Sequence, residues 1–277
     1  LGRARDLRDP KVFHHMSLVA FLAWVGLGAD GLSSSSYGPE QAFKALGEHT
    51  YLAVFLAIAV AATVFIISWS YTRIIEEFPN GGGGYMVASK HLGPYVGAVS
   101  GSALLVDYVL TIAVSIASGV DAVFSFLPAD WLPAKLTAVF VVLAILTLMN
   151  LRGVKESVTV LTPIFLLFLI TQAVLIFGAI GAHAGRIGEV ASGVQTGLHD
   201  HLREAGTLGV LLVFMRAFSL GGGTFTGIEA VSNGLPIMRE PRVRTGKRTM
   251  VLMAISLAIT AGGILFAYLL FDGHPVE

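Results

Sequence analysis

Long apolar segments recur along the chain, and they restrict its fold more than any other feature of the sequence. A run of about 20 apolar residues can cross the hydrocarbon core of a bilayer as an α-helix. Candidate spans lie at residues 13–46, 51–71, 94–127, 134–151, 158–183, 207–231 and 249–271. Composition agrees, because only 13% of the residues are charged, whereas a soluble globular domain usually carries about 25%. The sequence therefore predicts an all-α membrane protein with about seven spans.

Composition also excludes several kinds of function. The chain has no cysteine, so it forms neither disulfides nor thiolate metal sites. Its formal net charge of +0 argues against a nucleic-acid partner. The apolar segment that begins at Phe13 is not a signal peptide, because no small-residue cleavage site follows it and further apolar segments do. We expect membrane lipid to surround the protein, and we expect no cofactor.

Two of the spans are interrupted by flexible backbone. The first is apolar from Met16 to Leu27 and then breaks at residues 28–38, which are rich in glycine and serine. The sixth is apolar over residues 208–218 and breaks at residues 221–227. Such backbone is tolerated at membrane depth only where it lines protein or a water-filled cavity. Interruption of the first and sixth spans indicates an inverted five-plus-five repeat, in which this discontinuous pair holds the substrate.

This repeat predicts the organisation of the chain. We expect residues 1–277 to form one partial transmembrane transport domain with a cytoplasmic segment at 1–12. The first five-helix repeat is expected at 13–183, and the second repeat is expected to start at 207–277. Because the second repeat then has only two spans, the chain is expected to be truncated, with at least three further spans following it.

The distribution of basic residues predicts the orientation in the membrane. Cytoplasmic loops carry an excess of Lys and Arg. With the N-terminus inside, the outer segments hold only four of the 18 Lys and Arg residues, and one more lies within the sixth span. The four outer residues are Lys44, Lys135, Arg186 and Arg203, and the one within the sixth span is Arg216. The N-terminus is therefore predicted to be cytoplasmic.

Acidic residues within the predicted spans are the strongest functional signal. They are Asp30, Asp107, Asp121 and Glu229. A charged side chain at the centre of a bilayer costs about 2.5–3.5 kcal/mol on insertion scales, so it is rarely kept without a function. The alternative is a structural hydrogen bond or ion pair, for which Arg216 is the one nearby base. Asp121 lies near the outer end of its span, and for this residue the two interpretations are equally good.

The spacing of polar residues predicts that several of them share one site. Asp107, Thr111 and Ser115 lie at i, i+4 and i+8, which places them on one face of the third span. A second set surrounds the two breaks: Asp30, Tyr37, Thr226 and Glu229. Thr226 and Glu229 are expected on one side of the half-helix after the second break, because they lie at i and i+3. Carboxylate, hydroxyl and carbonyl oxygens are hard ligands, so we expect a small alkali cation.

Three other motifs point away from catalysis. Residues 33–36 are four serines, but they lack the second glycine of a nucleophile elbow and a histidine base at membrane depth, so they are expected to bond freed backbone groups. Residues 81–84 are four glycines without a following Gly-Lys-Ser/Thr, so they predict a tight turn or a close-packing point rather than a phosphate loop. The sequence 199–201, His-Asp-His, is expected in an outer loop, where solvated histidines are more common than a metal site.

Two sequence motifs carry a family resemblance. The stretch Phe-Pro-Asn-Gly-Gly-Gly-Gly-Tyr at 78–85 resembles the Pro-x-x-Gly-Gly-x-Tyr signature of the amino acid–polyamine–organocation (APC) superfamily. The stretch Ala-Asp-Gly-Leu-Ser-Ser-Ser-Ser-Tyr-Gly at 29–38 is similar to the first-helix motif of KimA-type potassium importers, which are related to the KUP group. The resemblance implies a LeuT-like fold and an N-terminal fragment of such an importer.

The resemblance extends to three helices and implies a set of potassium ligands. These are Asp30, Tyr37, Asp107, Tyr108, Thr111, Ser115, Thr226 and Glu229. The resemblance also implies a later-helix tyrosine of the site and a cytoplasmic C-terminal domain that dimerises and binds a cyclic dinucleotide, and neither has a counterpart within residues 1–277. A homodimer is therefore expected only for the full-length parent. The family couples potassium uptake to protons, so one of Asp30, Asp107 and Glu229 is expected to carry the proton.

Taken together, these observations predict a transporter rather than an enzyme. The leading hypothesis is secondary active import of potassium, coupled to protons, across the plasma membrane of a bacterium. The alternative is a proton-coupled amino acid permease of the same superfamily. Such permeases usually present bare backbone amides to a substrate carboxylate at the first break, which Asp30 would repel. A passive potassium channel is disfavoured, because the sequence has no Thr-Val-Gly-Tyr-Gly filter.

Overall fold

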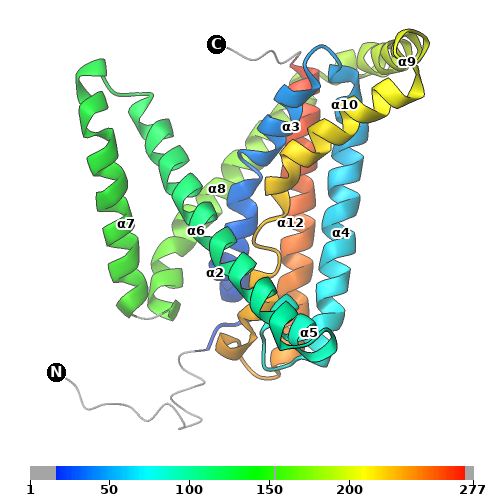
Figure 1. Cartoon of the computed structure of the whole chain (residues 1–277). Coiled ribbons are helices and arrows are strands. Elements are labelled where there is room, and N and C mark those ends of the chain that lie inside the picture. The colour runs from blue at the N-terminus through cyan, green and yellow to red at the C-terminus, as the bar shows by residue number, and fades with distance from the viewer. Residues whose placement is uncertain (1–16, 153, 272–277) are drawn as a thin grey trace, which may run out of the picture. The chain divides into compact units, whose positions relative to one another are not determined.

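The computed structural model describes residues 17–152 and 154–271, and these residues are almost entirely helical (Figure 1). Their α-helices are α2 (Ala20–Ser34), α3 (Gly38–Leu46), α4 (Ala53–Glu77), α5 (Gly83–His91), α6 (Pro94–Phe124), α7 (Lys135–Arg152), α8 (Val154–Ala182), α9 (Ile187–Glu204), α10 (Gly206–Leu220), α11 (Ala230–Asn233) and α12 (Arg242–Leu270). Short 3-10 helices connect some of them: η1 (Thr50–Leu52), η2 (Ala129–Ala134), η3 (Ala184–Arg186), η4 (Gly221–Phe225) and η5 (Leu235–Ile237).

Six helical segments of the described chain are long and apolar enough to cross a membrane. They are Thr50–Glu77, Pro94–Phe124, Ala129–Leu151, Ser157–Ala182, Gly206–Asn233 and Arg242–Leu270. They correspond to the second to seventh predicted spans. The first predicted span, 13–46, differs because the structure divides it into α2 and α3, each shorter than a membrane crossing, and because residues 13–16 lie outside the described residues. The predicted cytoplasmic segment at 1–12 also lies outside them.

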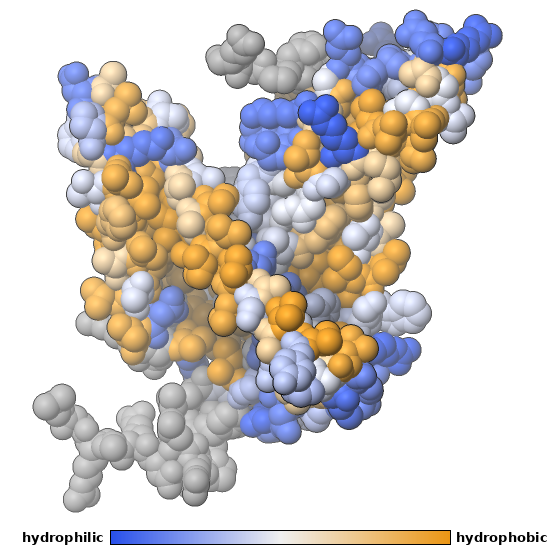
Figure 2. Space-filling model, in the orientation of Figure 1, coloured by the Kyte–Doolittle hydropathy of each residue, from blue (hydrophilic) through white to orange (hydrophobic). Residues whose placement is uncertain are grey.

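The exposed surfaces of these helices are apolar, as a lipid environment requires. On α7, Leu136, Phe140 and Leu148 are 66%, 61% and 64% exposed. Figure 2 shows hydrophobic residues along the middles of the helices and hydrophilic residues near their ends. A soluble protein rarely exposes contiguous apolar surface of this extent. The described helices therefore belong to a multi-pass membrane protein.

The described residues form two compact units. Unit one comprises residues 17–27, 73–162 and 229–249, and unit two comprises residues 28–72, 163–228 and 250–271. Each unit is therefore assembled from segments that are far apart in the sequence.

The core of unit two lies around α3, which packs against α10 (Figure 1). Ala42 and Phe43 of α3, Leu56 of α4 and Leu265 of α12 are buried in one hydrophobic cluster. Gly221, directly after α10, allows close approach, since a Cβ on it would lie 2.7 Å from the Cβ of Ala42. This packing holds the start of the second break against α3.

Helix α9 also belongs to unit two and lies between the fifth and sixth predicted spans, where an outer loop was expected. Val190, Val194 and Leu198 repeat at i, i+4 and i+8, so they share one face of the helix. Val194 and Leu198 pack against the hydrophobic cluster. The histidine-containing motif 199–201 is therefore helical, because an amphipathic helix buries more apolar surface here than a loop would.

The four-glycine segment closes a turn in unit one, because the backbone N–H of Gly81 donates to the carbonyl oxygen of Phe78 at 3.0 Å, and it is also a close-packing point. Gly81, Gly82 and Gly83 have φ values of 86°, 97° and 44°, a region that side chains with a Cβ disfavour. A Cβ on Gly81 would lie 2.8 Å from the Cδ of Pro236. The turn leads into the separate helix α5, which the sequence analysis did not predict. Helix α6 begins at Pro94, the predicted start of the third span.

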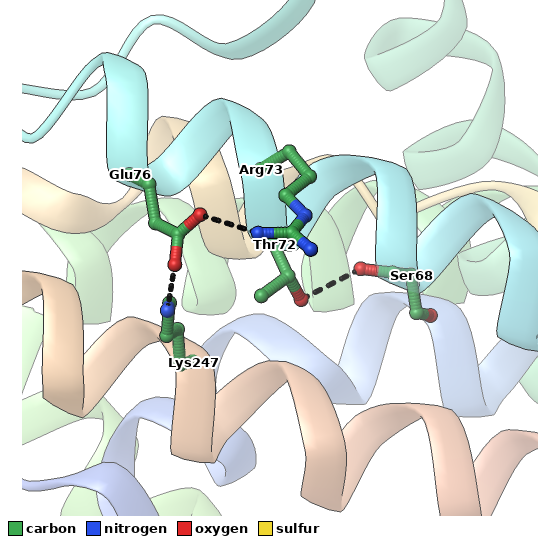
Figure 3. Close-up of polar contacts among 5 residues, drawn as sticks. All are labelled: Ser68, Thr72, Arg73, Glu76 and Lys247. Carbon is green, nitrogen blue, oxygen red and sulfur yellow. Dashed lines mark hydrogen bonds and ion pairs between the residues drawn. The ribbon is translucent and has the colours of Figure 1, made fainter.

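An ion-pair cluster connects α4 and α12 within unit one (Figure 3). Glu76 of α4 pairs with Arg73 at 3.2 Å and with Lys247 of α12. These side chains are 36–68% exposed, so solvent screens both pairs and they add little stability. One turn earlier on α4, the hydroxyl of Thr72 donates to the carbonyl oxygen of Ser68 at 2.9 Å. The main effect of the cluster is to connect the end of α4 to the beginning of α12.

Candidate functional site

The first predicted span is interrupted between α2 and α3, and the interruption is shorter than the predicted 28–38, because residues 28–34 belong to α2. Helix α2 ends at Ser34, and residues 35–37 form a turn before α3 begins at Gly38. Gly38 has no room for a side chain, because a Cβ on it would lie 2.2 Å from the Oγ1 of Thr224. The hydroxyl of Ser34 donates to the carbonyl oxygens of Gly31 at 2.5 Å and Thr224 at 3.1 Å. The two breaks therefore lie in direct contact within unit two.

The serine hydroxyls of the first break bond backbone oxygens, as the sequence analysis predicted. Ser33 donates to the carbonyl oxygen of Asp30 at 2.8 Å. Ser35 donates to the carbonyl oxygen of Leu32 at 2.6 Å. A carbonyl oxygen has two lone pairs, and that of Leu32 also accepts a bond from the backbone N–H of Ser35 at 3.2 Å. The serines thus stabilise the end of α2 rather than forming a nucleophile.

The break in the sixth predicted span is longer than expected. After α10 and η4, Thr226 is extended, with φ −64° and ψ 148°, and Gly227 has a φ of 82°. Helix α11 begins only at Ala230. The expectation that Thr226 and Glu229 share one side of a half-helix is therefore wrong, because the left-handed conformation of Gly227 interrupts the helical repeat between them.

Asp30 lies against this second break. A Cβ on Gly227 would be 2.6 Å from the backbone nitrogen of Gly31 and 2.8 Å from Oδ2 of Asp30. Gly31 also lies close to the backbone of the second break, since a Cβ on Gly31 would be 3.4 Å from the carbonyl oxygen of Thr226. The Asp30 carboxylate and the Thr226 backbone oxygen thus lie at the junction of the two breaks. Tyr37 is near this junction as well, with its Cε2 3.5 Å from the position of a Cβ on Gly223.

A cavity opens beside the first break in unit two, with a volume of about 440 Å³. Its lining residues are Ser36, Gln172, Leu175, Ile264, Ala267, Tyr268 and Phe271. The Oε1 of Gln172 is buried and has no hydrogen-bond partner in the described part of the chain. Broken backbone at membrane depth is expected beside such a space. Gln172 and Tyr268 were not predicted from the sequence, because their proximity depends on the packing of α8 against α12.

The predicted site residues of the third span lie on α6 in unit one. Thr111 is only 9% exposed, and Asp107, Tyr108 and Ser115 are half-buried. Their neighbours on the other faces of α6 are largely exposed. The shared face that the spacing predicted is therefore the least exposed face of this part of the helix. The hydroxyl of Tyr108 accepts a hydrogen bond from Nδ2 of Asn233 at 3.0 Å.

The eight predicted ligands thus fall into two groups. Unit two holds Asp30, Tyr37 and Thr226, and unit one holds Asp107, Tyr108, Thr111, Ser115 and Glu229. Glu229 directly precedes α11, and its carbonyl oxygen accepts bonds from the hydroxyl of Ser232 at 2.8 Å and the backbone N–H of Asn233 at 3.0 Å.

Asp121 differs from the other acids of the predicted spans. Its carboxylate lies 2.6 Å from the Nζ of Lys135, and its side chain is 55% exposed. This ion pair at the end of α6 favours the structural interpretation of Asp121. Arg216, the base that the sequence analysis considered as an internal partner, is exposed on α10.

The histidines of α9 do not form a metal centre. Among residues 17–152 and 154–271, no group of three or more His, Asp or Glu side chains could hold a metal ion. His201 instead packs edge-on against His49, with ring centroids 4.0 Å apart, and stacks on Tyr51. Burial and the neighbouring His201 lower the pKa of His49, and Glu48 opposes this shift. The lowered pKa favours the neutral form of His49, and the ring contacts indicate a packing role for the pair.

Comparison with known proteins gives concordant results. A family model described as amino acid permease matches residues 18–273. The chain is also 38% identical over 242 residues to "Potassium transporter KimA" of Bacillus subtilis (strain 168). That alignment covers 86% of this chain and 39% of the relative, so the chain spans about two fifths of the relative's length. Both descriptions are of transporters and not of enzymes. Because the family model covers most of its length, this multi-pass membrane protein belongs to the amino acid permease family.

Proposed function

We propose that the complete gene product containing this chain imports potassium by secondary active transport coupled to protons. The observation that carries the proposal is the Asp30 carboxylate at the junction of the two breaks. A full negative charge beside unwound backbone suits a cation, because carboxylate and carbonyl oxygens are hard ligands. The 38% identity to a potassium transporter supports potassium as that cation.

The proposed ligands are those of the sequence analysis. Asp30 is contributed by α2, Tyr37 by the turn after it and Thr226 by the second break. The remaining ligands are Asp107, Tyr108, Thr111 and Ser115 of α6 and Glu229, which directly precedes α11. The burial of Thr111 and the partial burial of its neighbours on one face of α6 support this set. One of the three acids Asp30, Asp107 and Glu229 also carries the proton.

The proposed architecture is the LeuT-like five-plus-five inverted repeat. Helices α2 and α3 form the discontinuous first span, and α10, η4 and α11 form the discontinuous sixth span. The first repeat comprises residues 13–183, and residues 207–277 begin the second. The excess of Lys and Arg on one side supports a cytoplasmic N-terminus in a bacterial plasma membrane.

Amino acid transport is the second candidate, because the family model is named for that activity. The position of Asp30 argues against it. Amino acid carriers receive the substrate carboxylate at positive helix ends, and a carboxylate at the junction of the breaks would repel that group. An amino acid substrate would therefore need a proton on Asp30.

The proposal predicts that the complete gene product restores growth of a potassium-uptake-deficient bacterium at low external potassium. Growth should follow the external potassium concentration, and the cells should accumulate potassium at a rate above that of cells with an empty vector. Radiolabelled amino acids are the control substrates in the same cells. Uptake of an amino acid that is indifferent to potassium, without any rescue of growth, would contradict the proposal.

Coupling to protons predicts that a protonophore stops net accumulation of potassium. Once the proton gradient collapses, symport has no driving force, so accumulated potassium should fall to the level of cells without the protein. Internal potassium is measured by flame photometry before and after addition. A potassium gradient that persists while the external pH electrode reports full proton equilibration would point to another energy source.

A further inference from the structure

Asn233 connects three elements of unit one, although the sequence analysis did not single it out. It is the last residue of α11 and is half-buried. Its Nδ2 donates to the hydroxyl of Tyr108 on α6 at 3.0 Å. Its backbone N–H donates to the carbonyl oxygen of Glu229 at 3.0 Å. One residue therefore bonds both the face of α6 that holds Asp107 and the residue that precedes α11.

The other end of the Asn233 amide faces the glycine turn. A Cβ on Gly83 would lie 2.5 Å from Oδ1 of Asn233 and 2.7 Å from Oγ of Ser232. Gly83 also has a φ of 44°, which disfavours any side chain there. The turn thus passes so close to α11 that the amide has little room to rotate. The orientation of the Asn233 side chain is fixed by packing on one side and by Tyr108 on the other.

A fixed donor has a defined effect on the tyrosine. A phenolic oxygen has two lone pairs and one hydrogen. The Asn233 amide occupies one lone pair, and this sets the direction in which Tyr108 presents the second lone pair and the hydrogen. A cation that coordinates this hydroxyl then binds an oxygen of fixed orientation. The conformational entropy lost on binding is therefore smaller, because the tyrosine hydroxyl is already ordered.

We infer that Asn233 is a positioning residue of the cation site, which orients the Tyr108 hydroxyl and connects it to the backbone at Glu229. The inference rests on the proposed function, because Tyr108, Asp107 and Glu229 are ligands of the proposed potassium site. Asn233 itself touches no ion in this arrangement and acts through Tyr108. Its substitution should therefore change the affinity for potassium more than the maximal rate.

The test is a double-mutant cycle in the complete gene product. Asn233→Leu removes the donor and keeps the number and branching of the side-chain heavy atoms, and Tyr108→Phe removes the acceptor oxygen. Loss of one hydrogen bond should raise the half-saturating potassium concentration about three- to tenfold in the Asn233→Leu variant. Because both residues act through one bond, adding Asn233→Leu to Tyr108→Phe should cause no further rise. Initial uptake rates are measured over a series of potassium concentrations, per amount of protein in the membrane.

Asn150 provides the matched control, because it is an exposed asparagine on α7, and Asn150→Leu should leave half-saturation unchanged. If Asn233→Leu does not accumulate in the membrane, Asn233→Ala takes its place in the cycle. The role of Asn233 would be overturned, and the proposed function would stand, by either of two results. One is an unchanged half-saturating potassium concentration in Asn233→Leu, and the other is additive effects of Asn233→Leu and Tyr108→Phe. Absence of potassium uptake by the unaltered protein would overturn the proposed function and the inference together.

Discussion

Asp30→Asn is expected to abolish the rescue of growth at low potassium. Asparagine keeps the size of the side chain and one carbonyl oxygen, but it removes the negative charge at the junction of the two breaks. A unit charge in contact with a cation contributes about 4 kcal/mol at an effective dielectric constant of 20. The half-saturating potassium concentration should therefore rise on the order of 100-fold or more. Growth across a potassium series and initial uptake rates measure this change.

Asp121→Asn is the matched control for this experiment. Asp121 is also an acid within a predicted span, but it pairs with Lys135 at an exposed end of α6. Removing its charge should lower stability by no more than about 1 kcal/mol and leave potassium half-saturation unchanged. Full rescue of growth by Asp30→Asn, with normal half-saturation, would remove Asp30 from the proposed site.

The membrane-spanning helices could be predicted well because their signal is local. Length and hydropathy are sufficient to identify six spans, and the Gly93-Pro94 pair marks the start of α6 at the predicted residue. The two interruptions fall within the predicted breaks, since glycine-rich backbone disfavours a helix irrespective of its neighbours, but the first is shorter than predicted because α2 continues through residues 28–34. The serine bonds to carbonyl oxygens also follow from local geometry.

The helices that were not predicted from the sequence are short or amphipathic. Helix α9 has a mostly polar sequence, and its 3.6-residue repeat of Val190, Val194 and Leu198 does not form an apolar run. Helix α5 begins within the four glycines, whose low helix propensity predicts a loop. In both cases tertiary packing stabilises a helix that the local sequence only weakly favours.

Asn233 could not have been found from its own surroundings. An asparagine at the end of a helix is usually explained by capping, and nothing near it in the sequence indicates a tyrosine partner. Its partner Tyr108 lies 125 residues earlier. The proximity of Asp30 to Gly227 is non-local as well, because it requires the two breaks to meet. Contacts of this kind arise from the fold and are visible only in three dimensions.

Gly227→Ala is expected to reduce potassium uptake at least about tenfold while the protein still reaches the membrane. A left-handed φ of 82° costs an alanine roughly 1–2 kcal/mol. In addition, its Cβ would lie 2.6 Å from the nitrogen of Gly31 and 2.8 Å from Oδ2 of Asp30. The nitrogen belongs to the backbone and the carboxylate is held next to it, so neither can give way alone. The substitution should therefore displace Asp30 from the junction without removing any proposed ligand.

Gly222→Ala separates this displacement from a general effect of altering the break. Gly222 lies in the same glycine-rich segment, but a Cβ on it would meet no atom within 4 Å, and its φ is not positive. Uptake by this variant should stay within about twofold of the unaltered protein, as for most substitutions at open positions. Equal uptake by the two alanine variants, at equal amounts of protein in the membrane, would show that contact between the breaks does not hold Asp30 in its working position.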